Sequence, residues 1–259
     1  MAFEKSVCAI RITVAVACLL AASVAGAEEA STEKRVDRGA NVETTARRLT
    51  AADFKQANPG AQARSLADWV VESGDANRTP FLIVDKKDAR VFVFDGEGHL
   101  QGEAPALLGI AIGDHSAPGV GDRELSTIPL KDRTTPAGRF QVEIGRNDKG
   151  KEILWVDYEA AISMHPVIDT PKERRPQRLA SPTVADNRIS FGCINVPIPF
   201  FSNVVARTFT GTKGVAYVLP EVRTIASVFK AYAAERPAHA HLDATPAAQP
   251  AAQPVRAKR

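Results

Sequence analysis

The sequence predicts a mainly β fold with a few helices, built as a β-sandwich or an open barrel. Short runs rich in β-branched and aromatic residues recur through the middle of the chain, from about residue 79 to residue 221. Turn-forming Asp, Gly and Pro residues separate these runs, and helical periodicity is confined to three short segments. Many short strands at regular spacing are typical of sandwiches and barrels.

The predicted strands begin with a hairpin. Residues 81–84 and 90–94 are apolar runs on either side of Asp85-Lys86-Lys87-Asp88, which predicts the hairpin turn. A second turn at residues 95–98 leads to a third strand near residues 99–104. The remaining strands are expected at residues 107–112, 140–144, 153–158, 161–164 and 215–219.

The helical segments are expected at residues 65–73, 199–208 and 222–234. In the first of them Ser65 is a suitable N-cap, and Asp68 stands three residues later, in the place of a capping box. Trp69 is expected to dock this helix on the main domain.

Two long polar loops interrupt the strands. They span residues 114–135 and residues 170–187, and the second contains Lys172, Arg174, Arg175 and Arg178. Long loops in compact domains are usually functional or disordered. Each loop precedes one of two motifs described below, so the pair could border a substrate cleft; simple surface insertions are the alternative.

The N-terminal residues 1–27 have the features of a secretory signal peptide. Lys5 and Arg11 supply positive charge, an apolar stretch follows, and Ala25-Gly26-Ala27 is a small-residue cleavage site. The apolar stretch is shorter than the ~20 residues that a bilayer requires, although a permanent membrane helix is the alternative. We expect a bacterial periplasmic protein with no integral membrane segment after cleavage.

The rest of the chain divides by composition into five parts. Residues 28–64 are polar and expected to be disordered or loosely helical, residues 65–78 form a short docking helix and linker, and residues 79–221 form the main domain. Residues 222–234 form a C-terminal helix, and residues 235–259 an Ala/Pro-rich disordered tail. His239 and His241 in this tail could bind a metal weakly, or could simply be solvated.

The composition excludes one class of partner. The formal net charge is only +3, and no lysine–arginine stripe with interleaved aromatics is present. We therefore expect no nucleic acid partner.

Cys193 would be the single cysteine of the mature chain, because Cys8 and Cys18 lie in the leader. A lone thiol cannot form an internal disulfide. In the oxidising periplasm it is either a buried small hydrophobe or a nucleophile.

A cysteine nucleophile needs a base, donors for an oxyanion, and an exposed sulfur. Gly192 leaves space beside the thiol, and the N–H groups of Gly192 and Cys193 are natural oxyanion donors. A helix that begins soon after the cysteine would favour the thiolate. Among the five histidines, His165 ends a predicted strand and is the favoured base; His115, in the first long loop, is the alternative.

Three motifs together resemble the L,D-transpeptidase catalytic domain family (YkuD-like). Thr135-Pro136-Ala137-Gly138-Arg139-Phe140 is similar to its TPxGxF element. Ser163-Met164-His165 and Ser190-Phe191-Gly192-Cys193-Ile194-Asn195 are similar to its histidine and its Ser-His-Gly-Cys signature. The order along the chain also agrees, and the resemblance covers about residues 79–221.

This resemblance implies a β-sandwich-like fold and a cysteine acyltransferase that needs no metal or cofactor. Cys193 would attack a peptide bond of a peptidoglycan stem peptide, form a thioester and release D-alanine. A second stem amine or an acceptor protein would then take the acyl group. His165 would be the general base, Ser190 would place the base or the motif backbone, and Gly192 with Cys193 would supply the oxyanion N–H groups.

Two positions depart from the family pattern. Phe191 replaces the histidine two residues before the cysteine, and Pro166 replaces the glycine after His165. Phe191 cannot carry a proton, and Pro166 has no backbone donor. A non-catalytic peptidoglycan-binding scaffold is therefore one alternative, and an L,D-carboxypeptidase-type hydrolase that uses water as acceptor is another.

Three further residues are candidates for substrate binding. Arg174 and Arg175 in the basic loop could hold the anionic carboxylates of the stem peptide, and Asn195 ends the cysteine motif. A solvated charged loop is the alternative for the two arginines.

Overall fold

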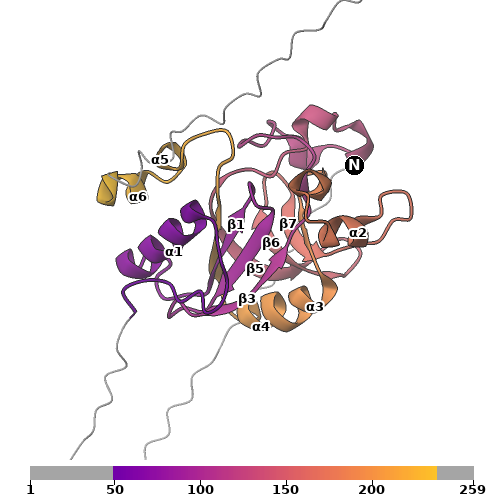
Figure 1. The fold of residues 1–259 in the computed structure, drawn as a ribbon. Coiled ribbons are helices and arrows are strands. Elements are labelled where there is room, and N and C mark those ends of the chain that lie inside the picture. The colour runs from indigo at the N-terminus through magenta and orange to yellow at the C-terminus, as the bar shows by residue number, and fades with distance from the viewer. Residues whose placement is uncertain (1–48, 238–259) are drawn as a thin grey trace, which may run out of the picture. The chain divides into compact units, whose positions relative to one another are not determined.

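The computed structural model describes residues 49–237. The predicted signal peptide, the segment from residue 28 to residue 48, and His239 and His241 lie outside the described residues. Within residues 49–237 the chain is mainly β with a few short helices, which confirms the predicted fold class (Figure 1). No helix in this range is long and apolar enough to cross a membrane.

Eight strands form one mixed sheet in the order β3-β2-β1-β10-β5-β6-β7-β9. Neighbouring strands are antiparallel except for two pairs, β1 with β10 and β7 with β9. The strands are β1 (Phe81–Asp85), β2 (Arg90–Phe94), β3 (Leu100–Pro105), β5 (Gly138–Arg146), β6 (Glu152–Asp157), β7 (Ile162–Pro166), β9 (Ile194–Val196) and β10 (Gly214–Val218). A separate short pair consists of β4 (Leu108–Gly109) and β8 (Arg188–Ser190).

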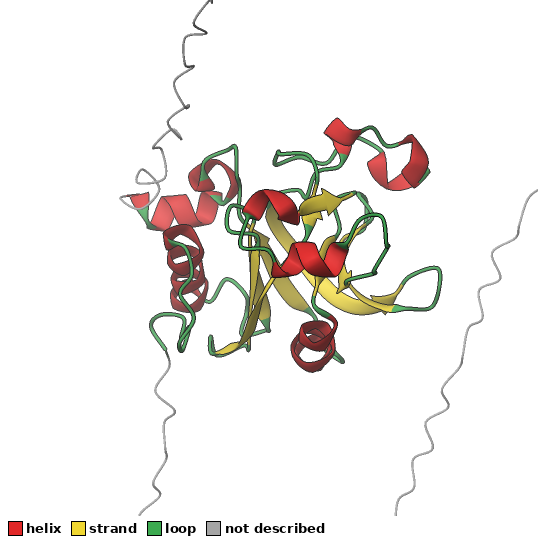
Figure 2. Cartoon of the chain, turned by 45° about the vertical axis from the view of Figure 1, so that its right-hand side comes forward, coloured by secondary structure: helices red, strands yellow, loops and turns green. Residues whose placement is uncertain are grey.

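The sheet curves until its two edges almost meet (Figure 2). Leu107, just after edge strand β3, exchanges two backbone hydrogen bonds of 2.8 and 2.9 Å with Asn195 of the opposite edge strand β9. One hydrophobic cluster accordingly contains Val84 and Val91 from one end of the sheet and Leu154 and Ile194 from the other. We call the Leu107–Asn195 junction the seam; it makes the sheet a nearly closed barrel.

The outer face of β1, β2 and β10 is covered by α1 (Ala61–Ser73), α5 (Ile225–Val228) and α6 (Lys230–Glu235) (Figure 1). Residues alternate between the two faces along each strand, so Leu82 points into the barrel while Phe81 and Ile83 pack against the helices. Trp69 of α1 stacks edge-on against the ring of Tyr232. Trp69 also belongs to the buried cluster that contains Phe81 and Tyr217 of the sheet.

The predicted disorder of residues 28–64 is wrong for residues 49–64. Phe54 is buried and packs edge-on against Phe92 and Phe94, and α1 begins at Ala61 rather than at Ser65. Ser65 therefore lies inside the helix and not at its N-cap, which is Gly60, and its hydroxyl bonds the Tyr232 hydroxyl at 2.7 Å. A single buried aromatic residue in a polar segment provides enough contact to hold it, and composition alone does not show this.

The other helices differ from expectation mainly at their ends. The predicted 199–208 helix is a continuous helical run, from α3 (Ile198–Phe200) through a π-helical turn to α4 (Ala206–Phe209). The predicted 222–234 helix breaks at Phe229, which is buried between α5 and α6. The second long loop contains α2 (Arg175–Ala180), and the first contains three 3₁₀ turns.

Lys86 lies in the predicted hairpin turn but has surroundings that the sequence did not predict. Its side chain is 0% exposed. Its ammonium donates to Gly113 O at 2.6 Å, Asp114 Oδ1 at 2.8 Å and Thr135 O at 2.9 Å. Glu221 lies 3.4 Å from the same ammonium and pairs with Arg188 as well. The hairpin turn is therefore bonded directly to both ends of the first long loop.

Candidate active site

The residues from Ser190 to Cys193 form a tight turn held by side-chain bonds. Ser190 Oγ accepts from the Gly192 N–H at 3.1 Å and donates to the Cys193 carbonyl at 2.6 Å. Thr135 of the TPxGxF element donates from Oγ1 to the Gly192 carbonyl at 2.8 Å. Two motifs that are far apart in sequence thus meet at this turn, and Ser190 holds its backbone.

Gly192 is required at its place in the turn. Its φ is +129°, a conformation that L side chains rarely adopt. A Cβ there would lie 2.6 Å from Ile162 Cδ1 and 2.7 Å from Thr134 O. The expectation that Gly192 supplies an oxyanion N–H needs correction, because this N–H is already directed at Ser190 Oγ.

Strand β7 places two polar side chains on the face that Cys193 contacts. Ser163 and His165 are two residues apart, so they share one face of the strand, while Met164 between them is buried in the core. Ser163 Oγ lies 3.8 Å from Cys193 Sγ, and the thiol lies 3.7 Å from the Ala161 carbonyl. The half-buried Cys193 thus lies beside β7 with its sulfur toward that strand.

His165 and Cys193 shift each other's ionisation. Burial opposes ionisation of the thiol, but the hydrogen bond and charge of His165, with hydrogen bonds from Ser163, lower the pKa of Cys193 below its ordinary value. Burial also disfavours the imidazolium, yet the interaction with Cys193 raises the pKa of His165. The pair therefore favours thiolate and imidazolium together.

The position of the imidazole proton follows from the contacts of His165. Its Nδ1 lies 2.8 Å from the Pro166 carbonyl, which can only accept, so Nδ1 carries the proton in the neutral ring. Nε2 is then the basic nitrogen. Pro166 does lack the backbone donor that a glycine would have, but its carbonyl fixes the tautomer.

Asn195 lies beside His165 in the parallel register of β7 and β9, and it is 0% exposed. Its Nδ2 lies 3.4 Å from His165 Nε2 and 3.3 Å from the Cys193 carbonyl, and its Oδ1 accepts from Arg175 Nη1 at 2.7 Å. A fully buried amide with all these partners has no atom left for a substrate. The assignment of Asn195 to substrate binding is therefore wrong.

The two candidate arginines of the basic loop have different surroundings. Arg175 is mostly buried and pairs with Glu173 at 2.7 Å in addition to Asn195. Arg174 is exposed, at the N-terminal end of α2, beside an open pocket of about 340 Å³ that Lys172 and Arg178 also line. Sequence analysis expected both arginines to bind substrate carboxylates, but of the two only Arg174 is exposed enough to do so.

Phe191, two residues before Cys193, lies under the side chain of Arg133. The guanidinium is 3.8 Å from the centroid of the ring, and Arg133 Nε donates to Ile128 O at 2.9 Å. Within residues 49–237 no carboxylate pairs with Arg133. The chain thus places an ordered cation, rather than an imidazole, against the cysteine turn.

Other expected features lie away from the thiol or are missing. His115 is exposed and contacts Arg223, and His99 pairs with Asp95 at a turn, so neither is brought to Cys193. The helix expected soon after the cysteine begins at Ile198, one residue before its predicted start and beyond β9. Helix-dipole stabilisation falls off within a turn, which leaves His165 and Ser163 to stabilise the thiolate.

Sequence reasoning did not single out Ser163, Arg133 or Lys86. Ser163 could have been found from the two-residue spacing to His165, which places both on one strand face. Arg133 and Lys86 owe their positions to contacts with residues far away in the chain, and no local pattern marks them.

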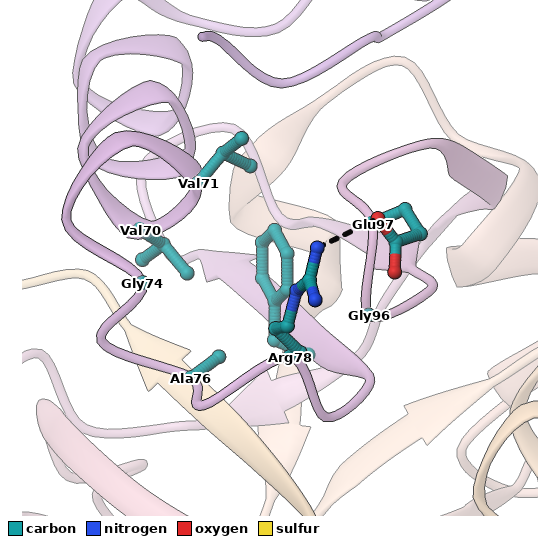
Figure 3. Close-up of a pocket in the computed structure, with 8 residues that line it drawn as sticks. Val70, Val71, Gly74, Ala76, Arg78, Gly96 and Glu97 are labelled. Atoms are coloured by element: carbon teal, nitrogen blue, oxygen red, sulfur yellow. Dashed lines mark ion pairs between the residues drawn. The ribbon is translucent and has the colours of Figure 1, made fainter. Parts of the chain in front are cut away.

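Elsewhere in residues 49–237 two open surface pockets of about 400 and 260 Å³ are present, and Cys193 lines neither of them. No group of three His, Cys, Asp or Glu side chains in this range could hold a metal. A cavity of about 20 Å³ between α1 and the turn after β2 has room for about one water (Figure 3). Arg78 and Glu97 point toward each other across its mouth, 3.8 Å apart.

Comparison with known proteins gives matches among solved structures only. No family model and no curated protein matches the chain. An L,D-transpeptidase variant of Enterococcus faecium is 16% identical with a TM-score of 0.32, over 54% of this chain and 50% of that one. An L,D-transpeptidase from Mycobacterium smegmatis is 16% identical with a TM-score of 0.32, over 54% and 58%.

The helical cell shape determining protein Pgp2 of Campylobacter jejuni is 16% identical with a TM-score of 0.37, over 60% of this chain and 55% of that one. The chain spans between half and three fifths of the length of these three proteins. Function therefore has to be argued from the residues of the site.

Proposed function

We propose that this chain is a periplasmic cysteine acyltransferase of the L,D-transpeptidase type, acting on peptidoglycan stem peptides. The observation that carries the proposal is the position of Cys193 beside Ser163 and His165 of β7, where the imidazole lowers the pKa of the thiol. The order of the TPxGxF, histidine and cysteine motifs supports the substrate class. The signal-like residues 1–27 support the compartment.

The acylation step uses both members of the pair. His165 Nε2 takes the thiol proton, and the thiolate attacks the carbonyl carbon of the stem peptide. The oxyanion forms beside the Cys193 N–H, which donates to no other acceptor within residues 49–237. His165 then returns its proton to the leaving amine, the C–N bond breaks, and a thioester remains on Cys193 while D-alanine leaves.

In the second step Cys193 is the leaving group, and an acceptor amine is the nucleophile. An acceptor amine, from another stem or from a protein, loses a proton to His165 and attacks the thioester. The C–S bond breaks, the acyl group passes to the amine, and Cys193 leaves as thiolate. If water takes the place of the amine, the same intermediate gives a hydrolase of the L,D-carboxypeptidase type.

A carbapenem tests the proposal directly, because its strained carbonyl acylates a nucleophilic thiol of this kind. Intact-mass spectrometry should show one stable adduct, and peptide mapping should place it on Cys193. Incubation with a tetrapeptide-stem muropeptide should then release D-alanine, and the ratio of cross-linked to hydrolysed product distinguishes transferase from hydrolase. Muropeptide binding with no adduct and no D-alanine would instead identify a non-catalytic scaffold.

The role of His165 is tested by the pH dependence of alkylation. Because the pKa of Cys193 is lowered in the fold, iodoacetamide should react with the wild-type thiol at a lower pH than with free cysteine. His165→Ala removes the stabilising partner, so the midpoint of the rate profile should move to higher pH. His115→Ala is the matched control and should leave the profile in place; the opposite pattern would make His115 the base.

The cation at Arg133 predicts a preference for anionic electrophiles. Wild-type Cys193 should react with iodoacetate faster, relative to iodoacetamide, than free cysteine does. Arg133→Met should lower this ratio by about 5-fold, the equivalent of a loss of about 1 kcal/mol of charge interaction near the surface. Arg90→Met on β2 serves as control. An unchanged ratio in Arg133→Met would mean that the guanidinium does not face the approaching group.

A further inference from the structure

The basic loop between β7 and β8 delivers one arginine into the interior behind His165. Arg175 is the first residue of α2, and its side chain is 12% exposed. Arg175 Nε donates to Glu173 Oε2 at 2.7 Å, and Arg175 Nη1 donates to Asn195 Oδ1 at 2.7 Å. Glu173 is itself bonded by Thr170, so the guanidinium is held from both sides.

The bond from Arg175 decides which way the Asn195 amide faces. A guanidinium can only donate, so it selects the amide oxygen. The amide nitrogen must then point the other way, to His165 Nε2 and to the Cys193 carbonyl. With the amide flipped, Asn195 would present its NH₂ to the guanidinium, which is repulsive in either charge state of His165. Its oxygen would also meet the lone pair of Nε2 while the imidazole is neutral, so Arg175 is the partner that fixes the amide in both states.

We propose that Arg175 is a positioning residue for His165: it fixes the amide of Asn195, and the amide holds the basic nitrogen of the imidazole in place beside Cys193. The catalytic meaning of this statement rests on the proposed function, but the geometry does not. The basic loop, which sequence analysis assigned to substrate binding, thus contributes a residue that holds the proposed base in position.

The charge of Arg175 acts in the same direction as its hydrogen bond. The charged groups that influence His165 are Cys193, whose thiolate raises the imidazole pKa, and Arg175, whose cation lowers it. Arg175 therefore limits the stability of the imidazolium. A less stable imidazolium returns its proton to a leaving group more readily.

Arg174 provides a matched control in the adjacent position. It has the same chemistry and belongs to the same loop, but it is exposed and bonds neither Asn195 nor His165. If both arginines bind the carboxylates of the substrate, neutralising either one should raise KM. A positioning role predicts that only Arg175 changes the chemistry of the thiol–imidazole pair.

The experiment compares Arg175→Gln, Arg175→Lys and Arg174→Gln in two assays. The first is the rate of iodoacetamide alkylation of Cys193 as a function of pH, which needs no substrate. In Arg175→Gln the titration step that depends on His165 should move to higher pH, because the cation that opposes the imidazolium is gone. Arg175→Lys keeps the charge and should restore the step at least in part, and Arg174→Gln should superimpose on wild type.

The second assay is turnover of a tetrapeptide-stem muropeptide. Arg175→Gln should lower kcat on the order of 10-fold to 100-fold, the loss expected of a misplaced catalytic group, with little change in KM. Arg174→Gln should keep its kcat. Thermal melts accompany both assays; if Arg175→Gln does not fold, the conservative Arg175→Lys carries the test, with an intact pH profile and a lowered kcat.

Three outcomes would overturn the inference. They are a pH profile of Arg175→Gln identical to wild type, a rise in KM with unchanged kcat, and equal effects of Arg174→Gln and Arg175→Gln. Failure of the wild-type chain to turn over any muropeptide would refute the proposed function instead. In that case the alkylation profiles still decide whether Arg175 positions His165.

Discussion

Cys193→Ala is expected to abolish release of D-alanine from a tetrapeptide-stem muropeptide and to prevent the carbapenem adduct. The loss in kcat should be on the order of 10⁴-fold or more, as for removal of other covalent nucleophiles. The reason is that Cys193 is the one free cysteine of residues 49–237, so no other thiol in that range can form the thioester. Product analysis by chromatography and intact-mass spectrometry measure the two effects.

Cys193→Ser is the control for shape. A hydroxyl fits where the thiol lies near Ser163 and Ala161, so this variant should melt like wild type. It should nonetheless react far more slowly, because a serine hydroxyl at this site ionises much less readily than the thiol. Full activity in either variant would remove Cys193 from the mechanism.

Lys86→Met should be among the most destabilising single substitutions in the domain. It leaves Asp114 and Glu221, whose side chains are 1% and 5% exposed, without their shared buried cation. Breaking a buried pair in this way costs about 3–5 kcal/mol. The measurement is the free energy of unfolding from urea titrations followed by circular dichroism.

Lys87→Met is the matched control, because Lys87 is exposed and its ammonium bonds Gln62 at 3.4 Å. It should change the free energy of unfolding by less than about 0.5 kcal/mol. Equal effects at the two positions would show that the buried network contributes no more than a surface charge.

The stability of the buried Lys86–Asp114–Glu221 network should depend on pH. Burial opposes ionisation of Asp114, but the N–H of Arg223, the ammonium of Lys86 and the N–H of Glu221 hold its pKa below the usual value. A depressed pKa contributes stability that is present above the unfolded value, near pH 4, and is lost as the pH falls through the folded value. In Lys86→Met the pKa of Asp114 should rise, so acid unfolding should begin at a higher pH than in wild type.

The parts of the fold that follow local rules were predictable from the sequence. The β1–β2 hairpin, the run from α3 to α4 and the pairing of Cys193 with His165 rest on periodicity, turn residues and the order of motifs. The errors have a common physical cause, which is a tertiary contact that overrides a local pattern. Phe54 orders a polar segment, and the carboxylates of Asp114 and Glu221 draw a turn lysine inward.

In the candidate site, too, some features followed from residue types and others depended on tertiary contacts. Residue types pointed to the proposed nucleophile and base, since the chemistry needs a thiol and an imidazole whatever the details of the fold. Residue types did not reveal that the Gly192 N–H bonds Ser190 or that Asn195 and Arg175 face inward. These roles depend on which donor faces which acceptor, and this requires the three-dimensional structure.

The seam has a consequence for how reactivity arises during folding. The backbone of Asn195 closes the barrel on Leu107, while its side chain holds His165 and the Cys193 carbonyl. Closure of the sheet thus fixes a residue that also contacts the thiol–imidazole pair. While the barrel is still open, Asn195 would lack its two backbone bonds to Leu107, and its amide would be held less firmly against His165.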